Sequence, residues 1–152
     1  MPEIGDKAPD FTLPTPEGEV SLAGHAGHPL VLYFYPRDDT PGCTTEALDF
    51  TRLAGEFEAA GAAVIGVSKD SVAKHGKFAA KHGLGVSLAS DEAGDTCERY
   101  GVWVEKSMYG KTSMGIERAT FLIGPDGTIL QVWRQVKVPG HAEAVLEAVR
   151  AL

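Results

Sequence analysis

Cysteine is scarce in this chain, which has two, Cys43 and Cys97, among 152 residues. Two cysteines cannot build a disulfide framework, and without repeated Cys-x-x-Cys pairs they do not form a zinc motif. No apolar run approaches the roughly 20 residues that a membrane-spanning helix needs. Lysine and arginine total 14 against 21 aspartates and glutamates, so the formal net charge is −7. A chain of this charge lacks the basic surface that binds nucleic acid, and we expect neither a nucleic acid nor a membrane as partner.

The beginning of the chain shows no targeting signal. Residues 1–6 contain neither a basic segment nor an apolar one of the secretory type. Together with the low cysteine content, this favours a cytoplasmic, reducing location. Hydrophobic residues make up 43% of the chain, which is enough for a buried core, and the length suits one domain over residues 1–152.

Hydrophobic periodicity and turn residues predict alternating strands and helices. The expected strands are residues 10–13, 19–22, 30–35, 62–68, 86–89, 119–124 and 128–134. The expected helices are residues 43–60, 71–82, 92–99 and 140–151, and the mixed stretch 104–117 is expected to be a loop. This order indicates an α/β domain. It fits a thioredoxin-like three-layer fold with a central mixed sheet and an N-terminal β-hairpin.

The most informative stretch is YPRDDTPGCT, residues 35–44. Thr40 is a favourable N-cap residue and Pro41 suits the first helical position, so Cys43 falls in the first turn of a helix. Unpaired backbone N–H groups and the helix dipole favour the reactive thiolate there. The alternative is that Cys43 is a small, buried and inert residue. Its place after the carboxyl end of a strand, where open α/β folds put their chemistry, favours the reactive form.

A thiolate at Cys43 also needs a cation nearby. The helix terminus contributes only about 0.3–1 kcal/mol, or about 2 kcal/mol when partly buried, whereas a cation about 4 Å away adds roughly 1–4 kcal/mol. Arg37 is close in sequence, but Asp38 and Asp39 compete for it. Arg118 is the better candidate, because its strand would begin beside the end of strand 30–35 if the two run antiparallel.

Pro36, Thr40 and Cys43 form the pattern Pro-x-x-x-Thr-x-x-Cys. With the run DDTPGCTTE at residues 38–46 and the distant Arg118, the chain resembles the peroxiredoxins. It is most similar to the branch of bacterioferritin comigratory protein and peroxiredoxin Q. The likeness covers nearly the whole chain.

The resemblance implies a thiol-dependent peroxidase. The Cys43 thiolate would attack the terminal oxygen of hydrogen peroxide or an organic hydroperoxide and become a sulfenic acid, which thioredoxin or another thiol reduces. The resemblance assigns orientation of the peroxide to the Thr40 hydroxyl, stabilisation of the thiolate and of the developing charge to Arg118, and exclusion of water to Pro36. It implies a monomer, and we expect no cofactor and no metal.

Glu46 lies three residues after Cys43, on about the same helical face. A bare carboxylate there would oppose the thiolate. We therefore expect Glu46 to pair with an arginine at the catalytic site, while an exposed helix acid stays open as the alternative.

The second cysteine departs from the family pattern. Many relatives carry a resolving cysteine five residues after the reactive one, where this chain has Leu48, or in the next helix, where it has Ala79 and Ala80. Cys97 matches neither position. It is either a resolving cysteine reached after local unfolding or a packed structural residue. We favour the second, which leaves a one-cysteine cycle with an external thiol as reductant.

Two other function classes are considered. A thiol–disulfide oxidoreductase would show Cys-x-x-Cys, but Thr40 and Glu46 occupy the positions three residues before and after Cys43. A redox-signalling module that relays oxidation from Cys43 to a partner protein stays open.

The histidines give no further site in the sequence. His25 and His28 lack ligand partners at metal-binding spacing. His75 and His82 are expected to be solvated residues of their helix.

Overall fold

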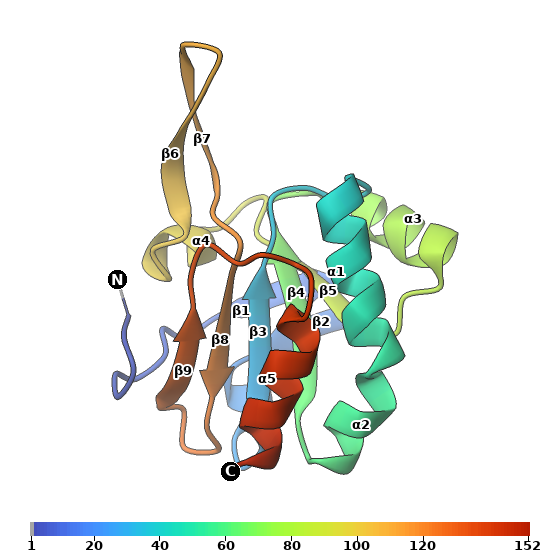
Figure 1. The fold of residues 1–152 in the computed structure, drawn as a ribbon, viewed down its shortest axis with the longest axis vertical. Helices are drawn as coiled ribbons and strands as arrows, with labels where there is room; N and C mark the ends of the chain where they lie inside the picture. Colours follow the sequence, from blue (N-terminus) through green and yellow to red (C-terminus); the bar gives the residue numbers. More distant parts are fainter. Residues whose placement is uncertain (1) are drawn as a thin grey trace.

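The computed structural model describes residues 2–152. A five-stranded sheet with the order β5-β4-β3-β8-β9 forms its centre (Figure 1). The strands are β3 (Leu30–Phe34), β4 (Ala63–Ser68), β5 (Ser87–Ser90), β8 (Ala119–Ile123) and β9 (Ile129–Trp133). β3 pairs parallel with β4 and antiparallel with β8. The predicted mixed sheet is therefore confirmed.

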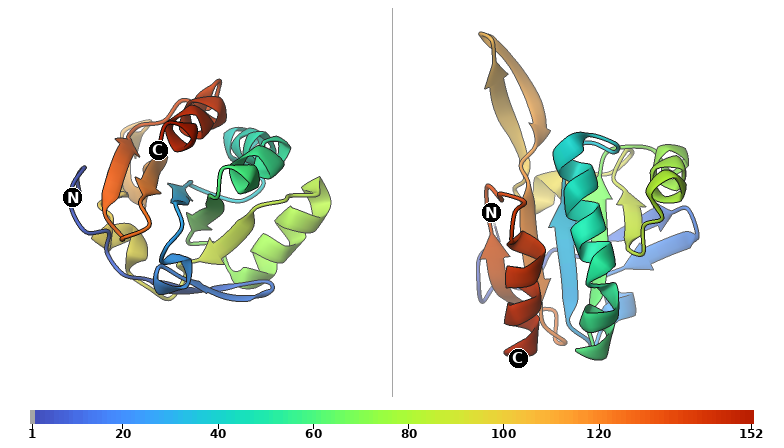
Figure 2. Two further views of the ribbon diagram at one scale, coloured as in Figure 1. Left: turned by 90° about the horizontal axis from the view of Figure 1, so that it is seen from below. Right: turned by 45° about the vertical axis from the view of Figure 1, so that its right-hand side comes forward.

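Both faces of the sheet are covered, as Figure 2 shows. All five residues of β3 are buried, because alternate side chains of a strand point to opposite faces and each face here has its own core. One core lies under α1 (Pro41–Arg52), α2 (Ala54–Ala59), α3 (Val72–His82) and α5 (His141–Arg150). The other lies under α4 (Thr96–Arg99) and the hairpin of β1 (Thr12–Thr15) and β2 (Gly18–Ser21). The predicted three layers and N-terminal hairpin are confirmed.

Aromatic packing anchors α1 over β3. The ring of Tyr33 stacks on Phe50 with centroids 4.7 Å apart, and aromatic pairs of this kind add to the burial of their area. Gly66 in the neighbouring strand makes room for Tyr33, since a Cβ there would lie 2.6 Å from Cζ of the tyrosine. This packing sets the position of α1, and therefore of its first turn, relative to the sheet.

Three predicted elements differ from the structure. The helix expected at 43–60 is two helices, α1 and α2, which meet at Leu53. Leu53 and Phe57 are both buried, so the core contacts continue across the break. The helix expected at 92–99 is only α4, because the Asp91 carboxylate accepts the backbone N–H bonds of Thr96 and Cys97 and marks its start.

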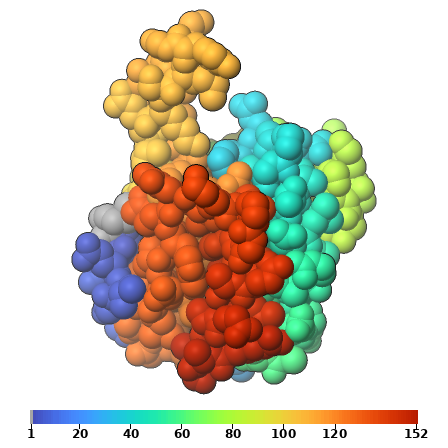
Figure 3. Space-filling view, viewed as in Figure 1, coloured from blue at the N-terminus to red at the C-terminus, as the bar shows by residue number. Residues whose placement is uncertain are grey.

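The expected loop at 104–117 is also wrong. It forms a β-hairpin, β6 (Trp103–Met108) and β7 (Lys111–Ile116), joined by Tyr109 and Gly110. Both have positive φ angles, 54° and 77°, as a two-residue hairpin turn requires. The pattern was missed because most of both strands is exposed, so no buried–exposed alternation marks them. The hairpin projects beyond the end of the central sheet (Figures 1 and 3).

Within residues 2–152, no helix has the length and apolar character needed to cross a membrane.

Candidate active site

The first turn of α1 lies just after the carboxyl end of β3. Thr40 has an extended backbone and Pro41 is the first helical residue, as the sequence predicts. The Thr40 hydroxyl does not cap the helix. It donates instead to the carbonyl oxygen of Arg37, at 2.9 Å. The Cys43 side chain lies in this turn and is 2% exposed.

Arg118 contacts the sulfur. Phe34 pairs with Ala119 across β3 and β8, so the residue before Ala119 lies beside the end of β3, as expected from an antiparallel pair. Nη2 of Arg118 donates to Cys43 Sγ at 3.3 Å. Gly42 leaves room for this contact, because a Cβ there would lie 3.2 Å from the same nitrogen. The structure thus brings together a cysteine and an arginine 75 positions apart.

Glu46 holds the other side of the guanidinium. Its Oε1 accepts from Nη1 of Arg118 at 2.6 Å, and the side chain is 1% exposed. The predicted pairing with an arginine is confirmed, and the exposed helix acid is wrong. Burial works to lower the pKa of Arg118, but attraction to Glu46 and Cys43 outweighs it and leaves the pKa above its usual value. The guanidinium therefore stays charged beside the sulfur.

The Glu46 carboxyl itself retains a proton unusually well. Burial raises its pKa to about 7 against the opposing attraction of Arg118. Its second oxygen, Oε2, has no hydrogen-bond partner in the part of the chain that the structure describes, and an ionised carboxylate is costly to bury in that state. Near neutral pH the negative charge next to Cys43 is thus only partly formed.

Replacing Glu46 by glutamine is expected to remove a pH dependence of stability. In the folded protein the carboxyl holds its proton up to about pH 7, whereas the ordinary value is 4.5. The folded state therefore binds more protons between these values, and the free energy of unfolding falls as the pH rises through this window. Glutamine accepts the same bond from Arg118 and does not titrate. We expect the wild type to lose up to about 3 kcal/mol relative to Glu46→Gln across this window.

Urea unfolding of both proteins at several pH values measures this difference. A constant difference in unfolding free energy across the window would contradict a burial-driven rise in the pKa of Glu46.

The loop before α1 is held by residues of α3, and the Arg37 side chain does not take part. Arg37 is exposed. The two acids expected to compete for it are bound elsewhere: Asp38 by His75 and Asp39 by Lys81 and His82, all three from α3. Pro36 is partly buried at the end of β3.

The expectation of two solvated histidines is wrong. His75 is fully buried, and the side chain of His82 is only 22% exposed. The signal that could have placed His75 inside is its position three residues before the buried Phe78, on the same helical face.

A second cation, Lys106 of the hairpin, is electrostatically coupled to the site, and no sequence pattern indicated it. The stem of Lys106 lies against Gly115, where a Cβ would be 3.0 Å from its Cδ. Partial burial lowers the pKa of Lys106, and repulsion from Arg118 lowers it further, while Cys43 and Glu117 act in the opposite direction. Lys106 thus belongs to the electrostatic surroundings of Cys43. A loop prediction for this stretch could not reveal it.

Cys97 is not near Cys43. It lies in α4 and is fully buried in the core under α4 and the N-terminal hairpin, whereas Cys43 belongs to the core under α1. The central sheet separates the two. Burial, together with Asp91, raises the pKa of the Cys97 thiol well above its usual range. Its backbone N–H donates to Asp91 at 2.8 Å.

Comparison with known proteins gives a consistent picture. Residues 4–132 match the AhpC/TSA family. The chain is 55% identical over 133 residues to peroxiredoxin Bcp of Xanthomonas campestris, covering 88% of this chain and 83% of that protein. It is 48% identical to peroxiredoxin Bcp of Bacillus subtilis, covering 97% and 95%.

Solved structures agree. A Xanthomonas campestris bacterioferritin comigratory protein, studied for alkyl peroxide reduction, superposes with a TM-score of 0.88 at 52% identity, covering 93% of this chain and 90% of that one. PrxQ of Xylella fastidiosa gives 0.94 at 45% identity, covering 99% and 97%. With the cysteine at the start of α1 in contact with arginine, these likenesses place the chain in the AhpC/TSA family, among the Bcp/PrxQ peroxiredoxins, and it is a thiol-dependent peroxidase.

Proposed function

We propose that the protein reduces hydrogen peroxide and organic hydroperoxides in a one-cysteine cycle, with Cys43 as the sole redox-active residue. An external thiol, with thioredoxin as the expected one, reduces the oxidised sulfur. The observation that carries this proposal is the location of Cys97 in the core on the other side of the sheet, fully buried. A disulfide needs Cα atoms within about 7 Å, so joining the two cysteines would require disruption of the sheet or of its cores.

In the first step the Cys43 thiolate attacks the terminal oxygen of the hydroperoxide. The S–O bond forms as the O–O bond breaks, and the leaving alkoxide or hydroxide takes up a proton to become alcohol or water. Negative charge moves from sulfur to the leaving oxygen. Arg118 donates to the sulfur at 3.3 Å, so its charge is placed to stabilise both ends of this transfer.

Thr40 and Pro36 have supporting roles in this proposal. Because the Thr40 hydroxyl donates its proton to the Arg37 carbonyl, its oxygen remains able to accept a hydrogen bond from the peroxide and so to orient it. Pro36, with no N–H and partly buried at the end of β3, limits access of water. Glu46 holds the guanidinium in place.

In the second step the sulfenic acid reacts with the external thiol. Cys43 is 2% exposed, so a protein reductant requires the first turn of α1 to open. We also propose that the chain acts as a single-domain monomer in the cytoplasm, where reducing conditions keep thiols available. Its net charge of −7 supports no role for nucleic acid or a membrane surface.

Mass spectrometry after one equivalent of hydrogen peroxide tests the one-cysteine cycle. We expect a sulfenic acid at Cys43, trapped by a dimedone-type reagent, in most molecules. The Cys97→Ser variant is expected to keep turnover with a supplied thiol, because Cys97 takes no part. A Cys43–Cys97 disulfide in most of the protein would refute the proposal. Slow, substoichiometric consumption despite the reductant would instead favour the signalling module.

A further inference from the structure

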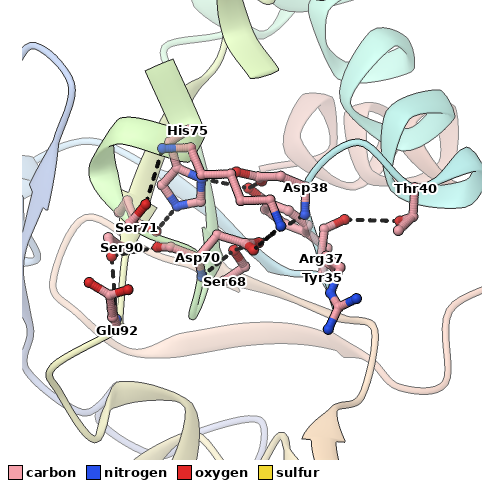
Figure 4. A network of polar contacts seen from close by, with 12 residues as sticks. Tyr35, Arg37, Asp38, Thr40, Ser68, Asp70, Ser71, His75, Ser90 and Glu92 are labelled. Atoms are coloured by element: carbon pink, nitrogen blue, oxygen red, sulfur yellow. Dashed lines mark hydrogen bonds and ion pairs between the residues drawn. The ribbon is translucent and has the colours of Figure 1, made fainter. Parts of the chain in front are cut away.

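A buried polar cluster joins α3 to the loop before α1 (Figure 4). The Tyr35 hydroxyl donates to Oδ1 of Asp38 at 2.6 Å. Nδ1 of His75 lies 2.6 Å from Oδ2 of the same carboxyl, and Nε2 lies 2.9 Å from the carbonyl oxygen of Ala89 in β5. Tyr35, Asp38 and His75 are each at most 2% exposed. His75 thus connects the loop to the central sheet.

The hydrogen-bond chemistry of this cluster is constrained. A carbonyl oxygen only accepts, so Nε2 of His75 carries a proton that it donates to Ala89. The short contact between Nδ1 and Asp38 requires one further proton between them. Buried polar groups are costly when unpaired. The loop is therefore held to α3 by a specific arrangement that few other side chains can reproduce.

The same cluster fixes the backbone of the loop. The N–H of Asp38 donates to Oδ2 of Asp70 at 2.8 Å, and this oxygen also accepts from the Ser68 hydroxyl at 2.7 Å. The carbonyl of the same peptide unit belongs to Arg37 and accepts from Thr40 Oγ1. One peptide is thus held on one side by the cluster and on the other by the residue that faces the peroxide. Asp39, the next residue, has a left-handed φ of 60°, a conformation that such contacts must stabilise.

A metal ion is not needed to explain the cluster. Asp38, Asp70 and His75 lie close enough together to bind one. Their ligand atoms, however, already make the hydrogen bonds given above or, for Oδ1 of Asp70, an ion pair with Lys74 at 3.0 Å.

We propose that His75 is a positioning residue for peroxide reduction: through Asp38 it holds the Arg37–Asp38 peptide, and with it the Thr40 hydroxyl, in the arrangement that receives the peroxide beside Cys43. His75 itself touches neither the sulfur nor the substrate. It acts from α3, whereas the guanidinium that donates to Cys43 comes from Arg118, before β8.

This role predicts that the oxidation of Cys43 and the reduction of its sulfenic acid respond differently when the loop is loosened. Oxidation of Cys43 needs the loop in place, because the peroxide must be oriented by Thr40. Reduction of the sulfenic acid needs Cys43, which is 2% exposed, to become accessible. Loosening the loop should therefore slow the first step without slowing the second, whereas general damage to the fold would slow both.

The test uses three variants of the full-length protein. In His75→Gln, the amide can still donate to Ala89, but its oxygen then faces the Asp38 carboxylate, and we expect the oxidation rate constant to fall about tenfold. In Asp38→Asn, the new amide can donate to Nδ1 of a neutral His75, so we expect a change of no more than about threefold. In the double variant the asparagine amide introduced by the second change can donate to the glutamine oxygen introduced by the first, so the rate should recover.

Single-turnover oxidation by hydrogen peroxide and reduction of the sulfenic acid by dithiothreitol are measured for each protein. Lys77→Ala is the matched control, since Lys77 is an exposed residue of α3 outside the cluster and its replacement should change either rate less than about twofold. An unchanged oxidation rate in His75→Gln would overturn the proposal. So would a double variant as slow as His75→Gln, or a reduction step slowed as much as the oxidation step.

Discussion

The Cys43→Ser variant is expected to consume hydroperoxide no faster than the buffer does. The first step needs a nucleophile that is anionic near neutral pH. Its attacking atom must also be able to bond to the transferred oxygen and be oxidised, as sulfur is. A serine hydroxyl is neither ionised nor oxidisable under these conditions. The surrounding geometry should survive, because the side chain is almost the same size and Arg118, which donates to the sulfur at 3.3 Å, can also donate to a hydroxyl. Peroxide consumption with excess dithiothreitol measures the loss.

Cys97→Ser is the matched control for this experiment. It changes the other thiol in the same conservative way, in the core on the opposite side of the sheet. We expect it to retain the wild-type rate at saturating reductant. If Cys43→Ser still consumed peroxide at a rate near that of the wild type, the nucleophile would have to be another group, and the assignment of Cys43 would fail.

Replacing Arg118 by alanine should have the second-largest effect, because this side chain acts twice. In the proposed mechanism it stabilises the thiolate before reaction, and it stabilises charge on the leaving oxygen during reaction. Removal of one electrostatic donor of this kind costs about 10²–10³ in rate. The part due to the thiolate alone comes from a cation about 4 Å away, worth roughly 1–4 kcal/mol, and the pairing of the same guanidinium with Glu46 places it near the lower end of that range. We therefore expect the rate constant for oxidation to fall about 100-fold or more, and alkylation by iodoacetamide at neutral pH to fall only about tenfold.

The two rates separate these roles. Alkylation requires only the thiolate, so it reports the first role alone, whereas oxidation by peroxide reports both. Arg118→Lys, which keeps the charge but cannot hold the sulfur and Glu46 together, should fall between alanine and wild type. Arg52→Ala is the control, since it removes an exposed ion pair between α1 and Glu143 and should leave both rates unchanged. An identical alkylation profile in Arg118→Ala would remove Arg118 from its role.

Most of the fold could be predicted from local sequence patterns. The elements that were predicted wrongly have local causes. The strand expected at 30–35 and the helices expected at 71–82 and 140–151 were identified correctly to within about a residue. The hairpin at 103–116 was missed because it packs few of its residues on the body, so its sequence carries no burial pattern. The break at Leu53 was missed because apolar residues continue at helical spacing on both sides of it.

The candidate site also has a part that local sequence predicts and a part that depends on strand pairing. Thr40, Pro41 and Cys43 are neighbours in sequence, so a helix start and a cysteine in its first turn could be predicted from residue types alone. The antiparallel pairing of β3 and β8 was a hypothesis in the sequence. Its register, with Phe34 opposite Ala119, is what brings Arg118 to Cys43.

The sequence by itself determined that a cysteine stands in the first turn of a helix, that the domain is of the α/β class and that neither familiar resolving position holds a cysteine, because each depends on neighbouring residues. Only the tertiary structure decided that Glu46 is buried against Arg118, that Cys97 lies across the sheet and that His75 faces Asp38. The physical reason is that the burial and charge of a polar side chain depend on partners brought from distant segments. Strand order and register select those partners, and no local pattern encodes them.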